Sequence, residues 1–145
     1  MRVFVDACFL IYLNTLRGER RKPFEEFWEK LLEEEPILNV IVLDETLYIS
    51  RRYGVPYHET LEFLRRVVLP FAEVVPLDAG DLYTAEKYLV SYNIKPSDAL
   101  HIATMEKAGA SLIVSEDKEF DRITWIKRLW LTSPTSASAQ FSSGR

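Results

Sequence analysis

The stretch PSDALHIATMEKAGASLIVSED, residues 96–117, decides the predicted fold. Its proline is placed to start a helix, and Gly109 is placed to end it. The apolar run Leu112–Val114 then predicts a short buried strand. Asp98 falls in the first turn of the helix and Asp117 follows the strand, so this unit should bring both acids to the same edge of a sheet.

Strands and helices alternate along the rest of the chain. Val3–Asp6 predicts a first strand, and the helical spacing of apolar residues through Leu16 predicts the helix that follows it. Further strands are expected at Val74–Leu77, Leu112–Val114 and Ile123–Ile126. This alternation is typical of a parallel sheet in an α/β sandwich. Ligands of such sheets bind beyond the carboxyl ends of the strands.

Residues 39–53 are ambiguous, because the run Val40–Leu43 could form a strand. Leu47 and Tyr48 continue the run with helical spacing, so we favour a helix that ends at Gly54. Other helices are expected over Phe24–Glu35, from Pro56 onward, and after an Asp78 cap.

The bulk composition is typical of one globular domain. The chain has 145 residues, enough for a substantial core, and its 48% hydrophobic and 28% charged residues exclude the disordered class. A formal net charge of −4 argues against sequence-independent binding to duplex nucleic acid. We expect a folded domain over residues 1–131 and a flexible tail over residues 132–145, which cloning could have added.

Cysteine content and hydropathy predict an intracellular protein. Cys8 is the single cysteine, so an intramolecular disulfide is impossible. Asp6 interrupts the N-terminal segment where a signal peptide needs an apolar stretch. No apolar run approaches the roughly 20 residues that span a membrane. We therefore expect a cytoplasmic protein that binds no membrane.

Four acidic residues stand in otherwise apolar sequence at the ends of predicted elements. They are Asp6, Glu45, Asp98 and Asp117. A carboxylate beside buried elements is costly unless its charge is compensated, and a shared divalent cation with oxygen ligands is the simplest compensation. Carboxylates held close together repel, so we expect raised carboxyl pKa values in the metal-free site. The pattern predicts a metal-dependent hydrolase of phosphodiesters.

The acids belong to motifs that resemble those of the PIN-domain ribonucleases, which include the VapC-type toxins of prokaryotic toxin–antitoxin pairs. The resemblance extends from Met1 to about Leu131. Its motifs are Val5-Asp6 with Leu10-Ile11-Tyr12-Leu13, Leu43-Asp44-Glu45, Ser97-Asp98-Ala99-Leu100-His101-Ile102-Ala103, and Ile113-Val114-Ser115-Glu116-Asp117-Lys118-Glu119-Phe120. The last two motifs, in this order and at this spacing, are fairly specific together.

The resemblance implies a three-layer α/β/α sandwich around a short parallel sheet, one or two Mg²⁺ or Mn²⁺ ions, and hydrolysis of single-stranded RNA. It also implies homodimers and a partner antitoxin protein. The family often has a hydroxyl or amide residue after its first Asp, where this chain has Ala7 and Cys8, so a supporting hydrogen bond could be missing. On the matching positions, the family's metal-binding acids are Asp6, Glu45, Asp98 and Asp117, with Glu119 or Asp121 as a variable fifth acid.

Each acid also has a purely structural interpretation. Asp6 could cap the helix after it, and Asp98 could serve the helix dipole. Asp44 is the alternative to Glu45 as a ligand. The acids around the last motif could lie in a solvated turn: Glu116, Glu119 and Asp121.

Other side chains could serve either function or structure. His101 lies one helical turn after Asp98, and it could line the site or be a hydrogen-bonded core residue; neither it nor His58 has the spacing of a zinc motif. The pairs Arg51-Arg52 and Arg65-Arg66 could contact RNA phosphates or simply be solvated. The large apolar residues expected at a dimer surface are Phe24, Phe27, Trp28, Tyr48, Tyr53, Phe63 and Val67.

Two other functions fit the same sequence. One is a catalytically inactive PIN-fold binding or scaffold protein, although a scaffold has no reason to keep carboxylates together at a chemical cost. The other is a metal-dependent nuclease or phosphatase that acts on DNA or on small substrates, because the surrounding surface selects the substrate.

Overall fold

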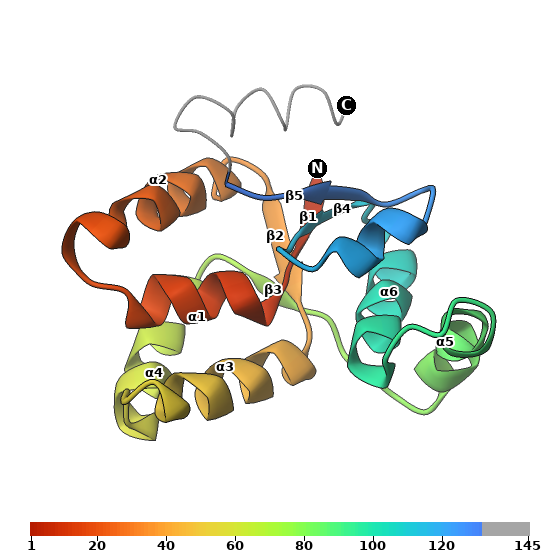
Figure 1. Ribbon diagram of the computed structural model, residues 1–145, viewed down its shortest axis with the longest axis horizontal. Coiled ribbons are helices and arrows are strands. Elements are labelled where there is room, and N and C mark those ends of the chain that lie inside the picture. Colours follow the sequence, from red (N-terminus) through yellow and green to blue (C-terminus); the bar gives the residue numbers. More distant parts are fainter. Residues whose placement is uncertain (132–145) are drawn as a thin grey trace.

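A parallel sheet with the strand order β3-β2-β1-β4-β5 lies at the centre of the computed structural model, which describes residues 1–131 (Figure 1). The strands are β1 (Arg2–Val5), β2 (Glu35–Leu38), β3 (Glu73–Val74), β4 (Leu112–Val114) and β5 (Lys127–Leu129). The helices are α1 (Ala7–Thr15), α2 (Lys22–Leu31), α3 (Val40–Arg52), α4 (Tyr57–Phe63), α5 (Gly80–Val90) and α6 (Pro96–Ala108). The tail predicted over residues 132–145 lies outside the described residues.

The helices form two layers around this sheet. In Figure 1, α1 and α2 lie on one side of the sheet and α5 and α6 on the other, while α3 packs against α1 and α4 against α3. The predicted three-layer α/β/α sandwich is confirmed. Among residues 1–131, none of the helices is both long and apolar enough to cross a membrane.

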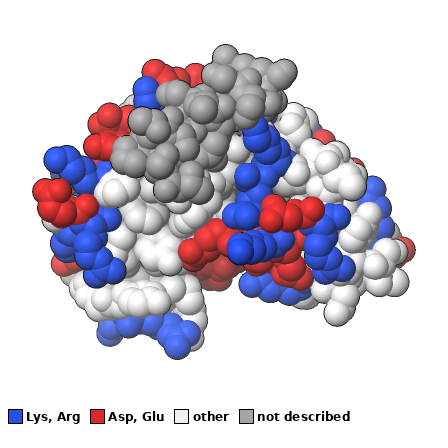
Figure 2. Space-filling model, turned by 45° about the horizontal axis from the view of Figure 1, so that its top comes forward, with Lys and Arg blue, Asp and Glu red and all other residues white. Residues whose placement is uncertain are grey.

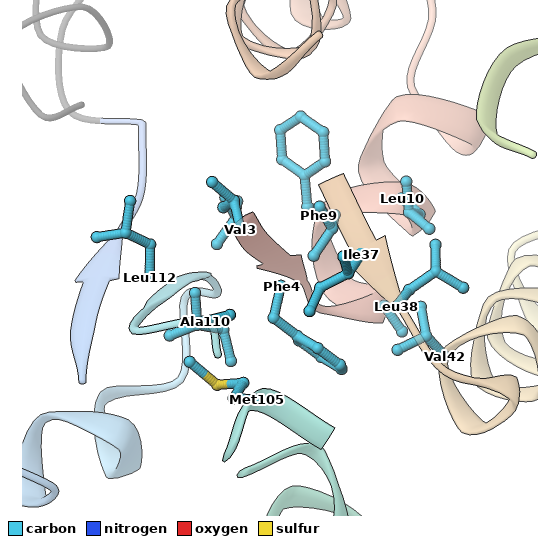
Figure 3. Packing of buried hydrophobic residues seen from close by; sticks show 14 of the residues in the cluster. Val3, Phe4, Phe9, Leu10, Ile37, Leu38, Val42, Met105, Ala110 and Leu112 are labelled. Carbon is cyan, nitrogen blue, oxygen red and sulfur yellow. The ribbon is translucent and has the colours of Figure 1, made fainter. Parts of the chain in front are cut away.

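The alternation of side chains along β1 joins the two helical layers to the sheet. Val3 and Phe4 are both fully buried and point to opposite faces (Figure 3). Phe9 of α1 lies on the same side as Val3, and Met105 of α6 lies on the same side as Phe4. The ring of Phe4 also packs against that of His101, with a centroid distance of 4.9 Å. The central strand therefore holds α1 and α6 in fixed positions relative to each other.

Strand β2 occupies residues that the sequence pattern places at the end of a helix, so it is an addition to the predicted sheet. Proline is unusual inside a strand, and Pro36 follows an acidic run, which together conceal β2. Pro36 fits because the pairing of β2 with β3 begins one residue later, with Ile37 opposite Glu73.

Strand β5 lies further along the chain than predicted. The expected strand Ile123–Ile126 is a turn, and the buried side chains of Ile123 and Ile126 account for its apolar signal. The actual strand carries half-buried Lys127 and Arg128, which suit an edge strand but do not look like a core strand in sequence.

The dimer surface expected from sequence needs correction. Phe27, Trp28 and Phe63 are only 3%, 5% and 8% exposed and belong to the core, so they cannot supply an interface. Phe24 and Val67 are partly buried against the same core. Tyr48 and Tyr53 remain exposed.

The helices α3 and α6 agree with the sequence prediction at both ends. Asn39 caps α3 by accepting a hydrogen bond from the Val42 N–H. Helix α6 starts at Pro96 and stops at Gly109, whose φ of 70° lies in the left-handed region. This stop lets the chain turn directly into β4.

Replacing Gly109 tests whether that turn depends on the left-handed backbone. Gly109→Ala should lower the free energy of unfolding by about 1 kcal/mol, because a β-carbon disfavours positive φ. Gly109→Asn should cost less, because asparagine tolerates this conformation. Urea denaturation monitored by circular dichroism measures both values, and equal stability of wild type and Gly109→Ala would contradict the assignment.

Candidate active site

The site lies where the strand order of the sheet reverses. From β1 the chain continues to β2 on one side, while β4 pairs with β1 on the other, with Val5 opposite Val114. In parallel sheets the crevice beyond the carboxyl ends of the strands at such a point is the usual ligand site. Asp6 follows β1 and Ser115 follows β4, and the Asp6 N–H still donates to the Val114 carbonyl at 3.0 Å.

Asp6 is held in place by hydrogen bonds to both of its carboxylate oxygens. Oδ1 accepts from the Ala7 N–H at 2.8 Å, so Asp6 does cap α1. Oδ2 accepts from the Ser115 hydroxyl at 2.7 Å. The Ser115 oxygen in turn accepts from the Asp117 N–H at 3.1 Å. One hydroxyl therefore ties the ends of β1 and β4 together.

Three acids meet at the start of α6 and the end of β4. Asp98, Asp117 and Glu119 each bring a carboxylate oxygen to within 4.8 Å of the other two. Asp98 is 4% exposed and sits in the first turn of α6. Asp117 caps a short 3₁₀ turn, Lys118–Arg122, by accepting from the Glu119 N–H at 2.9 Å. That turn is what places Glu119 beside the other two acids.

The other two candidates for a fifth acid have partners elsewhere. Asp121 pairs with Arg128 through contacts of 3.0 and 3.2 Å and is exposed. Glu116 accepts hydrogen bonds from the Tyr12 hydroxyl at 3.1 and 3.3 Å. Among the candidates, Glu119 is thus the one that the turn brings to Asp98 and Asp117.

Glu45 reaches the site from α3. Its Oε1 lies 3.7 Å from Nε2 of His101, and the same nitrogen lies 3.7 Å from Oδ1 of Asp6. Asp44, the alternative ligand, is exposed. The histidine is fully buried, so it is a core residue. Its closeness to Asp6 and Glu45 means that it also lines the site.

All four predicted acids interact electrostatically with Lys95, which lies at the edge of the site. The pKa of Asp98 rises from 3.8 to about 7, because burial disfavours its charged form and the negative charge of Asp6 adds to the effect. The Lys95 ammonium lies 3.8 Å from Asp98 at the rim, and its pKa is raised first by Asp98 and further by Asp117, Glu45 and Asp6. The raised carboxyl pKa expected from repulsion is found at Asp98, but burial is its first cause and the charge of Asp6 only its second.

Cys8 lies beside Asp6, but its thiol is unreactive because it keeps its proton. Burial, with the Asp6 charge as the second cause, raises the pKa of the Cys8 thiol to about 12. Its sulfur lies 3.9 Å from Asp6 Oδ2. The residues after Asp6, Ala7 and Cys8, were not expected to supply a supporting hydrogen bond to it. The Ser115 hydroxyl supplies that hydrogen bond from the end of β4.

The arrangement fits a divalent cation. Glu45 Oε1, Asp98 Oδ2 and His101 Nε2 are buried side-chain atoms without a hydrogen-bond partner among the described residues. Two of these atoms are carboxylate oxygens, which are ligands that Mg²⁺ and Mn²⁺ prefer. Buried polar atoms are normally satisfied, so these oxygens indicate a ligand site.

Two residues of the site, Ser115 and Asn39, were not singled out from sequence. Both directly follow strands, as Asp6 does, and both are fully buried. A polar residue directly after an apolar strand is a signal that could have found Ser115. Asn39 could not be found this way, because β2 itself was missed.

The raised pKa of Asp98 predicts how the metal-free protein responds to pH. The folded state keeps a proton that the unfolded state loses, so this group makes the free energy of unfolding fall as pH rises between about 4 and 7. Asp98→Asn removes the buried charge, and it should raise the melting temperature at pH 8 by about 3–6 °C, with little change at pH 5.

Calorimetry with EDTA at both pH values measures this difference. Asp44→Asn makes the same chemical change at an exposed position and should have no effect at either pH. A lower melting temperature of Asp98→Asn at pH 8 would contradict the shifted pKa.

Comparison with known proteins gives both a family and structural relatives. Residues 3–126 match the PIN domain family. None of the curated proteins is significantly similar in sequence. Among solved structures, VapC20 of Mycobacterium tuberculosis, a toxin that cleaves the sarcin-ricin loop, has a TM-score of 0.68 and 21% identity, over 86% of this chain and 96% of that one.

Two further structures have the same fold. VapBC2 of Rickettsia felis, bound to a DNA fragment from its promoter, gives a TM-score of 0.68 at 16% identity, over 90% of this chain and 98% of the other. FitAcB of Neisseria gonorrhoeae gives 0.62 at 16% identity, over 91% and 97%. Because the family match spans most of the sequence and the fold agrees, the chain belongs to the PIN domain family.

Proposed function

We propose that this protein is a divalent-metal-dependent endoribonuclease that hydrolyses phosphodiester bonds of single-stranded RNA. The observation that carries the proposal is the meeting of Asp98, Asp117 and Glu119, together with buried carboxylate oxygens of Glu45 and Asp98 that have no hydrogen-bond partner within residues 1–131. PIN-family membership makes nuclease chemistry the natural use of such a site.

The residues that would hold the cation are Asp98, Asp117 and Glu119, with Asp6 and Glu45 beside them. A bound Mg²⁺ or Mn²⁺ supplies an activated water and neutralises charge on the phosphate. The chain itself supplies the orientation of the acids. Ser115 fixes Asp6 through a short hydrogen bond, and the 3₁₀ turn after Asp117 fixes Glu119.

Positive side chains near the site suit an RNA backbone. Lys95 holds its ammonium at the rim, close to Asp98 and exposed to solvent. Arg52 is exposed on α3, seven residues after Glu45 and so on the same helix face, about 10 Å further along. Arg65 and Arg66 are paired with Glu62 at 3.1 and 3.0 Å, so the Arg51-Arg52 pair is the better candidate for phosphate contacts.

The surface supports a single-stranded substrate. On the face shown in Figure 2, Lys and Arg side chains are interspersed with Asp and Glu side chains, so the described surface there carries mixed charge. Duplex binding by electrostatics alone needs many phosphate contacts on a basic surface. A flexible strand needs only a few local contacts to place one phosphate at the acids.

We further propose that the protein is the toxin of a toxin–antitoxin pair and acts in the cytoplasm on cellular RNA. Similar folds occur in VapC20, a toxin that cleaves the sarcin-ricin loop, and in VapBC2 and FitAcB. By this proposal the partner is an antitoxin protein that blocks the site. The alternative is a scaffold without activity, and the RNA-cleavage assay distinguishes it from the toxin.

Cleavage of single-stranded RNA should require both a divalent ion and Asp98. Asp98→Asn keeps size and removes one charge, so cleavage with Mg²⁺ or Mn²⁺ should fall about 100-fold or more, roughly 3 kcal/mol of transition-state stabilisation. Asp44→Asn, the exposed neighbour of Glu45, should cleave like wild type. EDTA should abolish all cleavage.

The controls separate the competing explanations. Equal cleavage by wild type and Asp98→Asn, or cleavage that survives EDTA, would point to a contaminating nuclease. A well-folded wild type that binds Mn²⁺ but cleaves no RNA, after removal of any bound inhibitor, would favour the scaffold.

We propose a homodimer formed through the outer faces of α3 and α4. Exposed large side chains there are Tyr48, Tyr53, Tyr57 and Leu61, with exposed fractions of 56%, 72%, 49% and 37%. Aromatic side chains of this kind are enriched at protein interfaces.

Tyr48→Glu should shift the protein toward the monomer, because a charge cannot be desolvated cheaply in an apolar interface. Tyr83→Glu makes the same change on α5, at a side chain that is 81% exposed, and should leave the dimer intact. Light scattering at micromolar concentration gives both masses. A monomeric wild type would refute the dimer.

A further inference from the structure

Asn39 is a fully buried amide whose orientation is fixed by its bonding partners. Its Oδ1 accepts the Val42 N–H at 3.2 Å as the cap of α3. Its Nδ2 therefore supplies both donors, one to the Thr104 hydroxyl at 2.9 Å and one toward His101 Nδ1 at 3.1 Å. Turning the amide over would break the cap and face Oδ1 toward both partners.

The fixed amide determines which ring nitrogen of His101 carries the proton. Nδ1 faces the Asn39 N–H and therefore accepts in the neutral ring, which places the single ring proton on Nε2. Nε2 is buried, without a hydrogen-bond partner among the described residues, and 3.7 Å from both Asp6 Oδ1 and Glu45 Oε1. Phe4 packs on the ring and restricts its rotation.

We propose that Asn39 and His101 are positioning residues for the acidic site. Asn39 sets the tautomer, and the His101 Nε2–H then attracts the carboxylates of Asp6 and Glu45 toward one point. This role rests on the proposed metal-dependent function. It explains why Asn39, the cap of α3, contacts His101, which lies between two acids. It also explains why three strands are each followed by a buried polar residue: Asp6 after β1, Asn39 after β2 and Ser115 after β4.

A neutral donor suits this position better than a fixed positive charge. An ammonium or guanidinium between Asp6 and Glu45 would neutralise them and compete with a cation for their oxygens. A neutral N–H leaves the negative charge available while it attracts both carboxylates across 3.7 Å, a distance longer than a hydrogen bond. The Ser115 hydroxyl holds Asp6 more tightly, through a 2.7 Å hydrogen bond from β4, as outer hydrogen bonds do around metal ligands in general.

The first test is the tautomer itself, measured on metal-free protein by ¹⁵N NMR of the histidine ring. Wild type should show a protonated Nε2 and an unprotonated Nδ1 on His101. Asn39→Asp keeps a good helix cap but places an acceptor where the donor was, so Nδ1 should become protonated. Asn14→Asp is the matched control, since Asn14 is another buried amide, donating to Ser50 and Thr60, and it should leave the His101 signals unchanged.

The second test is Mn²⁺ affinity, measured by calorimetry without RNA. His101→Leu removes the donor and should weaken binding about 10-fold or more, whereas His101→Gln can present an amide N–H in its place and should stay within about 3-fold of wild type. Melting temperatures confirm that each variant is folded.

The outcomes keep this proposal distinct from the nuclease proposal. A protonated Nδ1 in wild type, or unchanged ring signals in a folded Asn39→Asp, overturns the assigned tautomer. Equal Mn²⁺ affinity of wild type and His101→Leu overturns the positioning role, even if the wild type cleaves RNA. If the wild type binds no Mn²⁺, both the metal-dependent function and this role fail, whatever the tautomer.

Discussion

The parallel pairing of β1 with β4 is the constraint on which the candidate active site depends. Because Val5 lies opposite Val114, Asp6 and Ser115 leave the sheet side by side, and the Ser115 hydroxyl bonds to Asp6 and to the backbone of Asp117. A register shift of one residue would turn these side chains to the other face. Asp6 and Asp117 are thus placed by backbone pairing and not by attraction to each other, as groups of like charge require.

The collected negative charge is unfavourable for the folded chain alone. Burial together with the Asp6 charge raises the pKa of Asp98 to about 7, and Lys95 offsets the charge only from an exposed position where water screens it. Buried oxygens of Glu45 and Asp98 still lack hydrogen-bond partners among the described residues. A bound cation would reverse each of these costs at once. This imbalance favours a metal-binding enzyme over an inactive scaffold.

The central part of the fold, and the grouping of most residues of the candidate site, could be predicted from the sequence because their signals are local. Strong apolar runs and helix-ending residues mark β1, β4 and α6, and four acids stand at their ends or on α3. The sequence prediction missed both β2 and Asn39, and both omissions have the same physical cause. Pro36 and the acidic run before it conceal β2, and without β2 the buried cap Asn39 has no place at a strand end. Burial of aromatic residues such as Trp28 depends on how helices pack, which periodicity alone does not give.

The family and the site constrain the chemistry more strongly than the substrate. The solved structures have the same fold as this chain at identities of only 16–21%. Proteins of one fold act on many different substrates. By the proposed function, selection would come from side chains around the acids, such as Lys95 at the rim and Arg52 further along α3. Removing the Arg52 charge would then weaken binding of the strand while leaving the acids undisturbed, whereas removing Lys95 would also take away the positive charge that lowers the pKa of Asp98, so Arg52 is the position at which substrate choice can change independently of the acids.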